Sequence, residues 1–347
     1  MKLPPINLNH LKKLTDDTGI LQHAKYSTPR RTEGYTTDDN ARALIACIKH
    51  NQFFSPSETE KLIQIYLSFL LHMQRSDGKF HNFLSYQRHF QDDVGSEDSM
   101  GRALWACGYT MSADTPKDEK YLSKEIFDRG FKWANTFESP RAIAYTLLGL
   151  QHYKKAYPKD ENIIIHAQTL ADQLCELYQH TSKYNWQWFE RYLTYANARL
   201  PHALFEAYVT TKKGTYLKIA EKALKFLIQN QIIEDTLLPI GNGGFYIEHH
   251  ERAFYDQQPL ETACIIGAAT MAFSVTRKEK YRKVANIAFE WFLGKNSQHL
   301  EVYNRNTGGC YDGITAHGIN LNQGAESTIS YLLSRLNLES MKNIETQ

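Results

Sequence analysis

Several features that would place the chain in other protein classes are missing from its 347 residues. No apolar run reaches the roughly 18 residues that a membrane-spanning helix needs. The 40 basic and 38 acidic residues leave a formal net charge of +2, without the basic stripe that nucleic acid requires. The glycine-rich segment Gly241–Phe245 lacks the strand-then-helix context of a nucleotide site. We therefore expect neither a membrane nor a nucleic acid as partner.

Cysteine is also scarce, with five widely spaced residues that lie mostly in apolar helical contexts. An odd, scattered set of this kind is typical of buried thiols in a reducing compartment rather than of disulfides. No Cys-x-x-Cys or Cys-His pair is present, so we expect no zinc site and no cofactor. Because the N-terminus also lacks the apolar core of a signal peptide, a cytoplasmic protein is expected.

A recurring pattern is the most informative feature of the chain. Six times a short polar or acidic lead-in precedes a helical run rich in small apolar residues, at irregular steps of roughly 40 to 65 residues, as in repeated helical hairpins. The six segments are Thr36–Ile48, Ser96–Gly108, Glu138–Leu150, Tyr195–Ala207, Asp256–Ala269 and Asn322–Ser334. Small residues suit a crowded inner ring of helices, with the polar lead-ins directed toward one shared face.

Longer amphipathic segments alternate with these six and predict an outer ring with one face in water. They are Leu8–Leu14, Ser57–Gln74, Lys120–Thr136, Glu161–Gln179, Tyr216–Gln229 and Lys280–Leu293. Long polar loops that connect outer to inner helices contain β-prone stretches at Lys79–Leu84 and Gly244–Glu248, and loops of such length are usually functional. We predict an all-α (α/α)6 toroid with short β-hairpins at one end, a single domain over 1–341 and a disordered tail over 342–347.

Carboxylates concentrate at the starts of the inner segments. Asp38 and Asp39 lie in or just before a first helical turn, where a carboxylate is favoured as a cap. A cap needs only one of the two, so the pair with nearby Arg42 indicates a functional role. Asp98 closes a second acidic cluster, and Arg102 follows it at much the same offset.

Other acidic and basic residues of the loops and lead-ins suit either a ligand site or a purely structural role. Glu190 beside Arg191 could be a simple ion pair or part of the cleft, and Asp256 opens the fifth inner segment. With Asp98, Glu190 and Asp256 are reserve candidates for the opposing catalytic carboxylate. The remaining candidates for binding a polar ligand are Glu261, Asp312, His317 and Glu326.

Aromatic residues are frequent, with 21 Tyr, 17 Phe and 5 Trp. Such rings stack on sugars, although packing between helices would also use them. The loop candidates for stacking are Tyr35, Trp186, Trp188, Phe245 and Tyr311.

Two carboxyl groups that face each other across a cleft are sufficient for glycosidic bond cleavage. One donates a proton to the leaving oxygen, and the other activates water or attacks the anomeric carbon. The sequence supplies the carboxylates for this chemistry but not their separation.

The chain resembles the six-hairpin glycosidase superfamily of (α/α)6 toroids. The resemblance covers nearly the whole chain through its hairpin rhythm and is most specific at YTTDDNARAL (35–44) and QGAESTISYLL (323–333). The adjacent aspartates are similar to those of bacterial endo-α-1,6-mannanases, in which such a pair supplies the catalytic carboxylates. The resemblance implies that Asp38 and Asp39 serve as nucleophile and acid/base, in an order that it leaves open.

The segment Asn40-Ala41-Arg42 departs from the mannanase pattern, in which more aromatic residues follow the pair. A different catalytic pair, such as Asp98 with Asp256, therefore stays open.

The sequence favours hydrolysis of a glycosidic bond in an oligosaccharide, without metal or cofactor, and leaves two alternatives. A sugar 2-epimerase of the N-acylglucosamine type shares the toroid and uses histidines as acid and base. Five histidines lie in or near the loops and inner-helix starts, namely His81, His202, His249, His250 and His317. The other alternative is a toroid that binds a glycan without catalysis.

Overall fold

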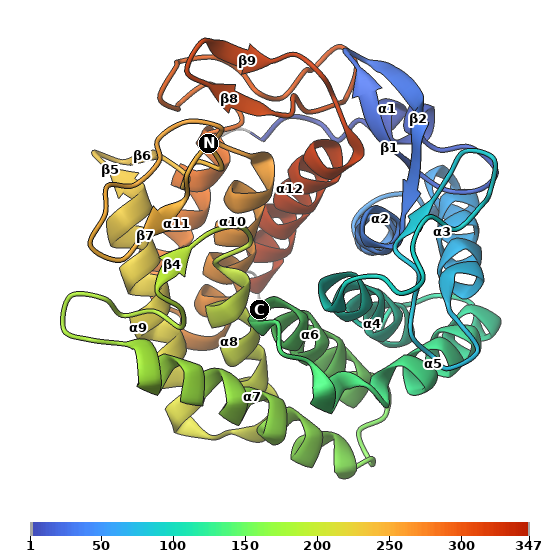
Figure 1. Ribbon diagram of the computed structural model, residues 1–347, viewed down its shortest axis with the longest axis horizontal. Coiled ribbons are helices and arrows are strands. Elements are labelled where there is room, and N and C mark those ends of the chain that lie inside the picture. The colour runs from blue at the N-terminus through green and yellow to red at the C-terminus, as the bar shows by residue number, and fades with distance from the viewer. Residues whose placement is uncertain (1–2, 346–347) are drawn as a thin grey trace.

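Twelve α-helices in two concentric rings make up most of the computed structural model, which describes residues 3–345 (Figure 1). The inner helices are α2 (Thr37–Asn51), α4 (Glu97–Ser112), α6 (Pro140–Ala156), α8 (Arg199–Thr211), α10 (Pro259–Thr276) and α12 (Ala325–Glu345). The outer helices are α1 (Asn9–Leu14), α3 (Glu60–Met73), α5 (Lys117–Phe131), α7 (Asn162–Thr181), α9 (Gly214–Gln231) and α11 (Glu279–Glu290). Two 3-10 turns occupy Pro56–Glu58 and Ala134–Thr136.

The inner helices pack in chain order, and the ring closes where α12 contacts α2. This architecture confirms the predicted (α/α)6 toroid, with each of the six small-residue segments on an inner helix. Small residues are needed there because neighbouring inner helices approach closely. A Cβ added to Gly108 of α4 would lie 2.4 Å from the carbonyl oxygen of Gly149 in α6, a contact that real side chains do not make.

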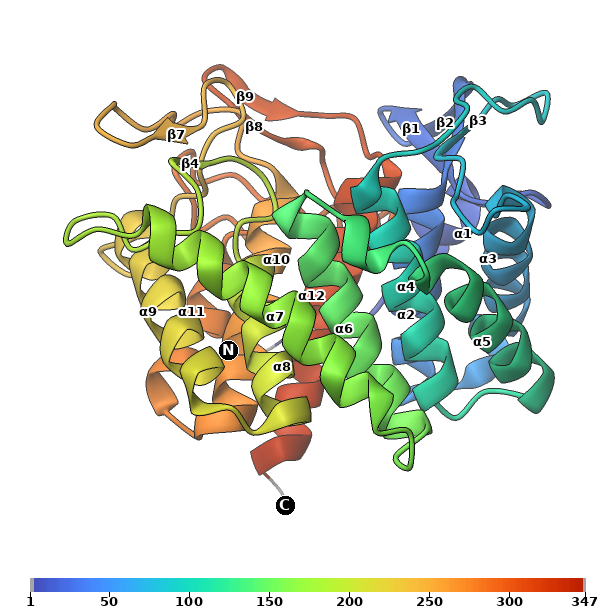
Figure 2. The same ribbon diagram turned by 60° about the horizontal axis from the view of Figure 1, so that its bottom comes forward.

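The strands lie at one end of the ring, where the inner helices begin (Figure 2). They are β1 (Leu21–Lys25), β2 (Thr28–Thr36), β3 (Phe83–Leu84), β4 (Tyr192–Leu193), β5 (Ile232–Ile233), β6 (Thr236–Leu237), β7 (Tyr246–Ile247), β8 (Gly313–Thr315) and β9 (Gly318–Asn320). β1, β2 and β3 form an antiparallel sheet, and β4 pairs with β7, β5 with β6 and β8 with β9. The two β-prone stretches contain β3 and β7, which are only two residues long, whereas the longer β1–β2 hairpin was not predicted.

Three sequence predictions about the chain as a whole have a structural outcome. All five cysteines are free and buried, as expected. The predicted disordered tail is wrong for residues 342–345, which form the last turn of α12, while residues 346 and 347 lie outside the described part. The third prediction was that no segment is long and apolar enough to span a membrane. Helix α10 is long and apolar enough by length and composition alone, but 78% of it is buried inside the protein.

Candidate functional site

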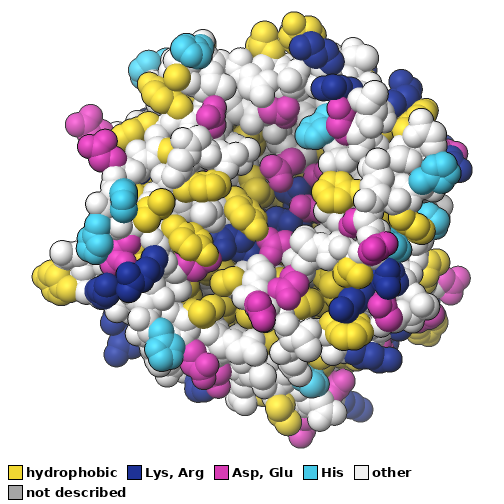
Figure 3. Space-filling view, in the orientation of Figure 1, with side chains coloured by type: hydrophobic (Ala, Val, Ile, Leu, Met, Phe, Trp, Pro, Cys, Tyr) yellow, Lys and Arg dark blue, Asp and Glu magenta, His cyan; other side chains and the backbone are white. Residues whose placement is uncertain are grey.

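A polar cleft of about 410 Å³ opens at the end of the ring where α2 and α12 begin. Figure 3 shows acidic and basic side chains gathered in the hollow at the centre of this face. The lining comes from β1, the start of α2, the β3 strand, the β8–β9 segment and the start of α12. Its residues are Gln22, His23, Thr36, Asp38, Asp39, Arg42, Asn82, Phe83, Gln258, Asp312, Asn320, Gly324, Glu326 and Ser327.

The start of α2 is fixed by a reciprocal cap. The Thr36 hydroxyl accepts a hydrogen bond from the Asp39 backbone N–H at 3.1 Å and donates one to Asp39 Oδ2 at 2.8 Å. The Asp38 backbone N–H donates to the side chain of Asn82 at 3.3 Å. Thr36 is therefore the helix cap, whereas Asp39, a candidate cap in one interpretation of the sequence, accepts the Thr36 hydroxyl and lines the cleft.

Arg42 connects three carboxylates across the junction of α2 and α12. Its Nη2 lies 2.9 Å from Asp39 Oδ1 and 3.1 Å from Glu326 Oε2, while its Nε lies 2.9 Å from Asp38 Oδ1. The second oxygen of Asp38 accepts a hydrogen bond from Arg102 Nη1 at 2.7 Å. Both arginines are almost completely buried, so these ion pairs form with little water present.

The four cleft carboxylates differ in how much of each remains available to a ligand. Burial, with the nearby Asp38 and Glu326 charges, raises the pKa of Asp39 well above the usual aspartate range, although Arg42 opposes the shift. Asp312 Oδ1 accepts hydrogen bonds from the Gly324 N–H and the Ser327 hydroxyl. Within the described part of the chain, Arg42 engages one oxygen of Glu326, and the Glu326 side chain is 39% exposed. The cleft thus combines a carboxyl that protonates readily with an accessible carboxylate.

Asp98 lies outside the cleft lining, at the start of α4. Its oxygens accept hydrogen bonds from the Ser139 hydroxyl at 2.5 Å and the Tyr195 hydroxyl at 2.9 Å. These hydrogen bonds connect the start of α4 with the segments that precede α6 and α8, so Asp98 has a structural role.

Two further buried carboxyls form a polar layer between α6, α8 and α10. Arg141 Nη1 lies 3.1 and 3.0 Å from the two oxygens of Glu190. Glu261 accepts hydrogen bonds from the backbone and side-chain N–H groups of Asn197. Burial raises the pKa of Glu261 to about 7. Glu190 and Glu261 are thus used inside the protein, and neither lines the cleft.

The prediction that Tyr35, Trp186 and Trp188 stack on a sugar is wrong, because all three rings are buried. The Tyr35 hydroxyl donates to Asp16 at 2.6 Å, and its ring is only 1% exposed. Trp186 packs edge-on against Phe226 and donates its indole N–H to the backbone of Glu190, while Trp188 is completely buried.

The other predicted residues lie on the loops around the opening rather than in the cleft lining. Asp256 and Arg191 are exposed, and the Arg191 carbonyl accepts the Glu248 N–H beside the β4–β7 pair. Phe245 is half-buried with a positive φ of 60°, and Tyr311 is half-buried against the core. His317 is exposed at the tip of the β8–β9 hairpin. Of the predicted catalytic residues, only Asp38 and Asp39 line the cleft, and Arg42, Asp312 and Glu326 join them.

Sequence reasoning did not single out several groups at the cleft. Phe83 is 41% exposed and lines it beside Thr36, to which it is paired in the β2–β3 ladder. His23 on β1 and Gln258 before α10 complete the polar lining. The only available signal was the position of Phe83 within the β-prone stretch that follows α3.

The comparisons with known proteins concern the fold. No protein-family model matches the sequence, and no curated protein is similar to it. Among solved structures, the cellobiose 2-epimerase of Bacillus thermoamylovorans superposes with a TM-score of 0.75 at 12% identity, covering 97% of this chain and 96% of that one. A D-mannose isomerase gives a TM-score of 0.73 at 12% identity, covering 96% and 94%.

An α-1,6-mannanase of family GH76 from Salegentibacter is also similar, with a TM-score of 0.66 at 11% identity over 96% of both chains. That structure is an inactive variant, with two consecutive aspartates replaced by alanine, in complex with α-1,6-mannotetraose. At these identities the matches establish the (α/α)6 toroid.

Proposed function

We propose that the protein is a carbohydrate-active enzyme and, more specifically, a glycoside hydrolase that uses the carboxylates of the cleft. The observation that carries the proposal is the Arg42 bridge. One guanidinium nitrogen binds both Asp39 and Glu326, so the two bonded oxygens lie no more than about 6 Å apart. The two carboxyl groups of glycosidases lie about 5–5.5 Å apart in retaining enzymes and about 6.5–9.5 Å apart in inverting ones, so a bound of about 6 Å fits the shorter separation.

The environments of the two carboxyls suit different roles. Asp39, with its raised pKa, is the proton donor to the glycosidic oxygen, because it keeps its proton to higher pH than an exposed aspartate. Glu326 keeps one unbonded oxygen in the cleft and acts on the anomeric carbon, directly or through water. The C1–O bond breaks as the proton moves to the leaving oxygen, and water supplies the hydroxyl of the new reducing end.

The remaining groups of the cleft bind and orient. Arg42 and Arg102 hold Asp38 between them, so Asp38 fixes the two guanidiniums and adds negative charge beside Asp39. Phe83 offers an exposed ring at the edge of the cleft, a suitable surface for a sugar face. A mannanase of the same fold is inactive without its consecutive aspartates, which supports a role for Asp38 and Asp39.

A sugar epimerase is the second candidate. His23 lines the cleft, and a histidine is a suitable base for removing a proton from carbon 2 of a sugar. Toroids with epimerase and isomerase activities are among the structures that resemble this chain.

A panel of variants tests the hydrolase. Wild type, Asp39→Asn and Glu326→Gln are incubated with manno-, gluco- and galacto-oligosaccharides of both anomeric linkages, and products are separated by chromatography and mass spectrometry. Cleavage by wild type should fall at least 100-fold in both variants. The matched control is Asp118→Asn, since Asp118 is an exposed aspartate in the first turn of the outer helix α5 and should leave the rate unchanged. Equal activity of all four proteins would reject the assignment of Asp39 and Glu326.

A further inference from the structure

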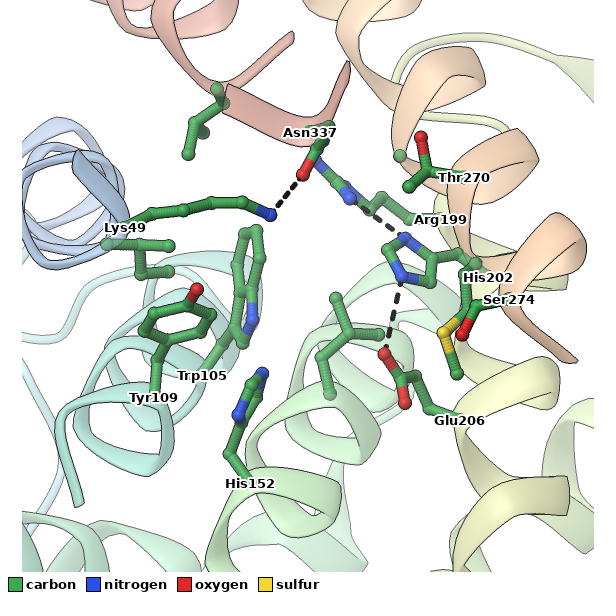
Figure 4. Close-up of a pocket in the computed structure, with 15 residues that line it drawn as sticks. Lys49, Trp105, Tyr109, His152, Arg199, His202, Glu206, Thr270, Ser274 and Asn337 are labelled. Atoms are coloured by element: carbon green, nitrogen blue, oxygen red, sulfur yellow. Dashed lines mark hydrogen bonds and ion pairs between the residues drawn. The ribbon is translucent and has the colours of Figure 1, made fainter. Parts of the chain in front are cut away.

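A second cavity, of about 210 Å³, lies inside the ring, and we call it the axial chamber (Figure 4). The ninth and thirteenth residues of α2, α4, α6, α10 and α12 all face it. Its lining is Ile45, Lys49, Trp105, Tyr109, Leu148, His152, Arg199, His202, Glu206, Gly267, Thr270, Met271, Ser274, Leu333 and Asn337. None of these residues lines the cleft. At a rise of 1.5 Å per residue, the ninth residue lies roughly 10 Å further along a helix than the cleft residues of the first turn.

Arg199 is buried in the wall of the axial chamber without an acidic partner. Among the described side chains of residues 3–343, no carboxylate lies within ion-pair distance of its guanidinium, and its Nε has no hydrogen-bond acceptor. Nη1 lies 3.0 Å from Nδ1 of His202, and the guanidinium carbon lies 4.9 Å from the centre of the Trp105 ring. A buried charge is normally paired, because leaving it without a counter-charge costs several kcal/mol. By contrast, Arg42, Arg102 and Arg141 each bind a carboxylate.

A second cation reaches into the same space from α2. Lys49 Nζ donates to Asn337 Oδ1 and has no carboxylate partner within the described chain. Burial, reinforced by Arg199, lowers the pKa of Lys49 to about 8, so it remains mostly protonated at neutral pH. The single carboxyl group of the chamber is Glu206, and burial raises its pKa to about 8. At neutral pH the axial chamber therefore contains more positive than negative charge.

Polar groups able to bind hydroxyls surround these cations. Thr270 Oγ1 and Glu206 Oε2 are buried without a hydrogen-bond partner. Ser274 and His152 add further donors and acceptors to the lining, as Figure 4 shows. At about 30 Å³ per water, the volume corresponds to roughly seven waters, enough for an oxyanion with a small hydroxylated group attached.

We propose that the axial chamber is a second ligand site, which binds a small oxyanion, such as phosphate or a phosphorylated or carboxylated sugar, between Arg199 and Lys49. The oxyanion accepts charge-assisted hydrogen bonds from both cations and supplies the missing counter-charge. This site is independent of the hydrolase assignment, because it uses none of the cleft residues.

The test measures binding by calorimetry and thermal denaturation at constant ionic strength. The probes are inorganic phosphate, glucose 6-phosphate and glucuronate, with glucose as the uncharged control. Each oxyanion that binds should raise the melting temperature above that in chloride. Arg199→Gln and Lys49→Gln should each weaken its binding at least tenfold. Lys155→Gln is the matched control, because Lys155 is an exposed cation in the last turn of α6, close to the chamber residue His152. This variant should change the affinity less than twofold.

The outcomes separate the site from its competitors. Glucose 6-phosphate binding more tightly than phosphate would support a phosphorylated sugar, tighter glucuronate would support a sugar acid, and equal affinities would support the oxyanion alone. Binding must survive Glu326→Gln, which acts on the cleft only. Equal melting temperatures in chloride and in all three oxyanions would overturn the proposal. So would binding that persists in Lys49→Gln and disappears in Arg102→Gln. If Arg199→Gln does not fold, the comparison of oxyanion affinity between Lys49→Gln and the control Lys155→Gln is sufficient to test the proposal.

Discussion

Replacing Arg42 with glutamine should remove the charge that holds the cleft together. The guanidinium is 97% buried and binds Asp38, Asp39 and Glu326 at 2.9, 2.9 and 3.1 Å. Removing one partner of a buried ion pair costs about 3–5 kcal/mol, because the remaining charge is left without compensation. Asp38 still pairs with Arg102 in the variant, so we expect the low end of this range, about 3 kcal/mol at pH 8. For a chain of 347 residues this corresponds to a melting temperature lower by about 4 °C.

The loss of stability should depend on pH in a defined direction. Without Arg42 the pKa of Asp39, which burial already raises, rises further in the folded state and stays ordinary in the unfolded state. The folded protein then binds more protons than the unfolded chain over the window above the ordinary carboxyl pKa, and stability falls as pH rises through that window. We therefore expect Arg42→Gln to cost about 1 kcal/mol at pH 5 and about 3 kcal/mol at pH 8.

Denaturant unfolding of wild type and variant at both pH values measures these differences. The control is Arg305→Gln, which breaks an exposed pair with Glu301 and should cost less than about 0.5 kcal/mol at either pH. A cost for Arg42→Gln below 1 kcal/mol at pH 8, or one that is larger at pH 5, would refute the electrostatic account of the cleft.

Three further predictions concern packing, binding and pH. Gly108→Ala should destabilise the protein by about 2 kcal/mol or more, because its Cβ meets a carbonyl of α6, whereas Gly214→Ala, with nothing within 4 Å, should be neutral in the same unfolding assay. Phe83→Ala should raise KM for an oligosaccharide about fivefold, because it removes a stacking surface. The control Tyr184→Ala, which removes an exposed ring outside the cleft lining, should leave KM unchanged. Similar kinetics for both variants would exclude stacking on Phe83. Glu261, whose folded pKa of about 7 exceeds its ordinary value, should make wild type lose roughly 2–3 kcal/mol relative to Glu261→Gln as pH rises from 4 to 8, and a difference independent of pH would contradict the assigned shift.

The ring of hairpins followed from local patterns, because each helix shows its own apolar periodicity and its small residues. The same reasoning located Asp38 and Asp39, since a carboxylate in the first turn of an inner helix must lie at the end where all six begin. Local sequence patterns could not predict which residues of distant helices contact each other across the ring. Arg42 and Glu326 are 284 residues apart, and only closure of α12 against α2 brings them together.

The aromatic predictions failed for a related reason. A Trp-x-Trp pattern places both rings on one side of an extended segment, whether that side meets solvent or a helix. Here Phe226 of α9 packs against both Trp186 and Trp188, a contact that depends on the tertiary fold. Phe83 was overlooked because its exposure at the cleft arises from pairing of β3 with β2, and the β1–β2 hairpin was not predicted.

The most direct measurement of the central proposal follows isotopes through the reaction. Oligosaccharides are incubated with the wild-type protein in H₂¹⁸O and, separately, in D₂O, and the masses of the products are measured by mass spectrometry. Hydrolysis predicts shorter oligosaccharides that gain one ¹⁸O, 2 Da, at the new reducing end, and this product should be absent with Asp39→Asn and Glu326→Gln. Substrate of unchanged length that gains one deuterium at carbon 2 would contradict hydrolysis and identify an epimerase. Unaltered substrate that nevertheless binds the protein would leave a glycan-binding toroid without catalysis.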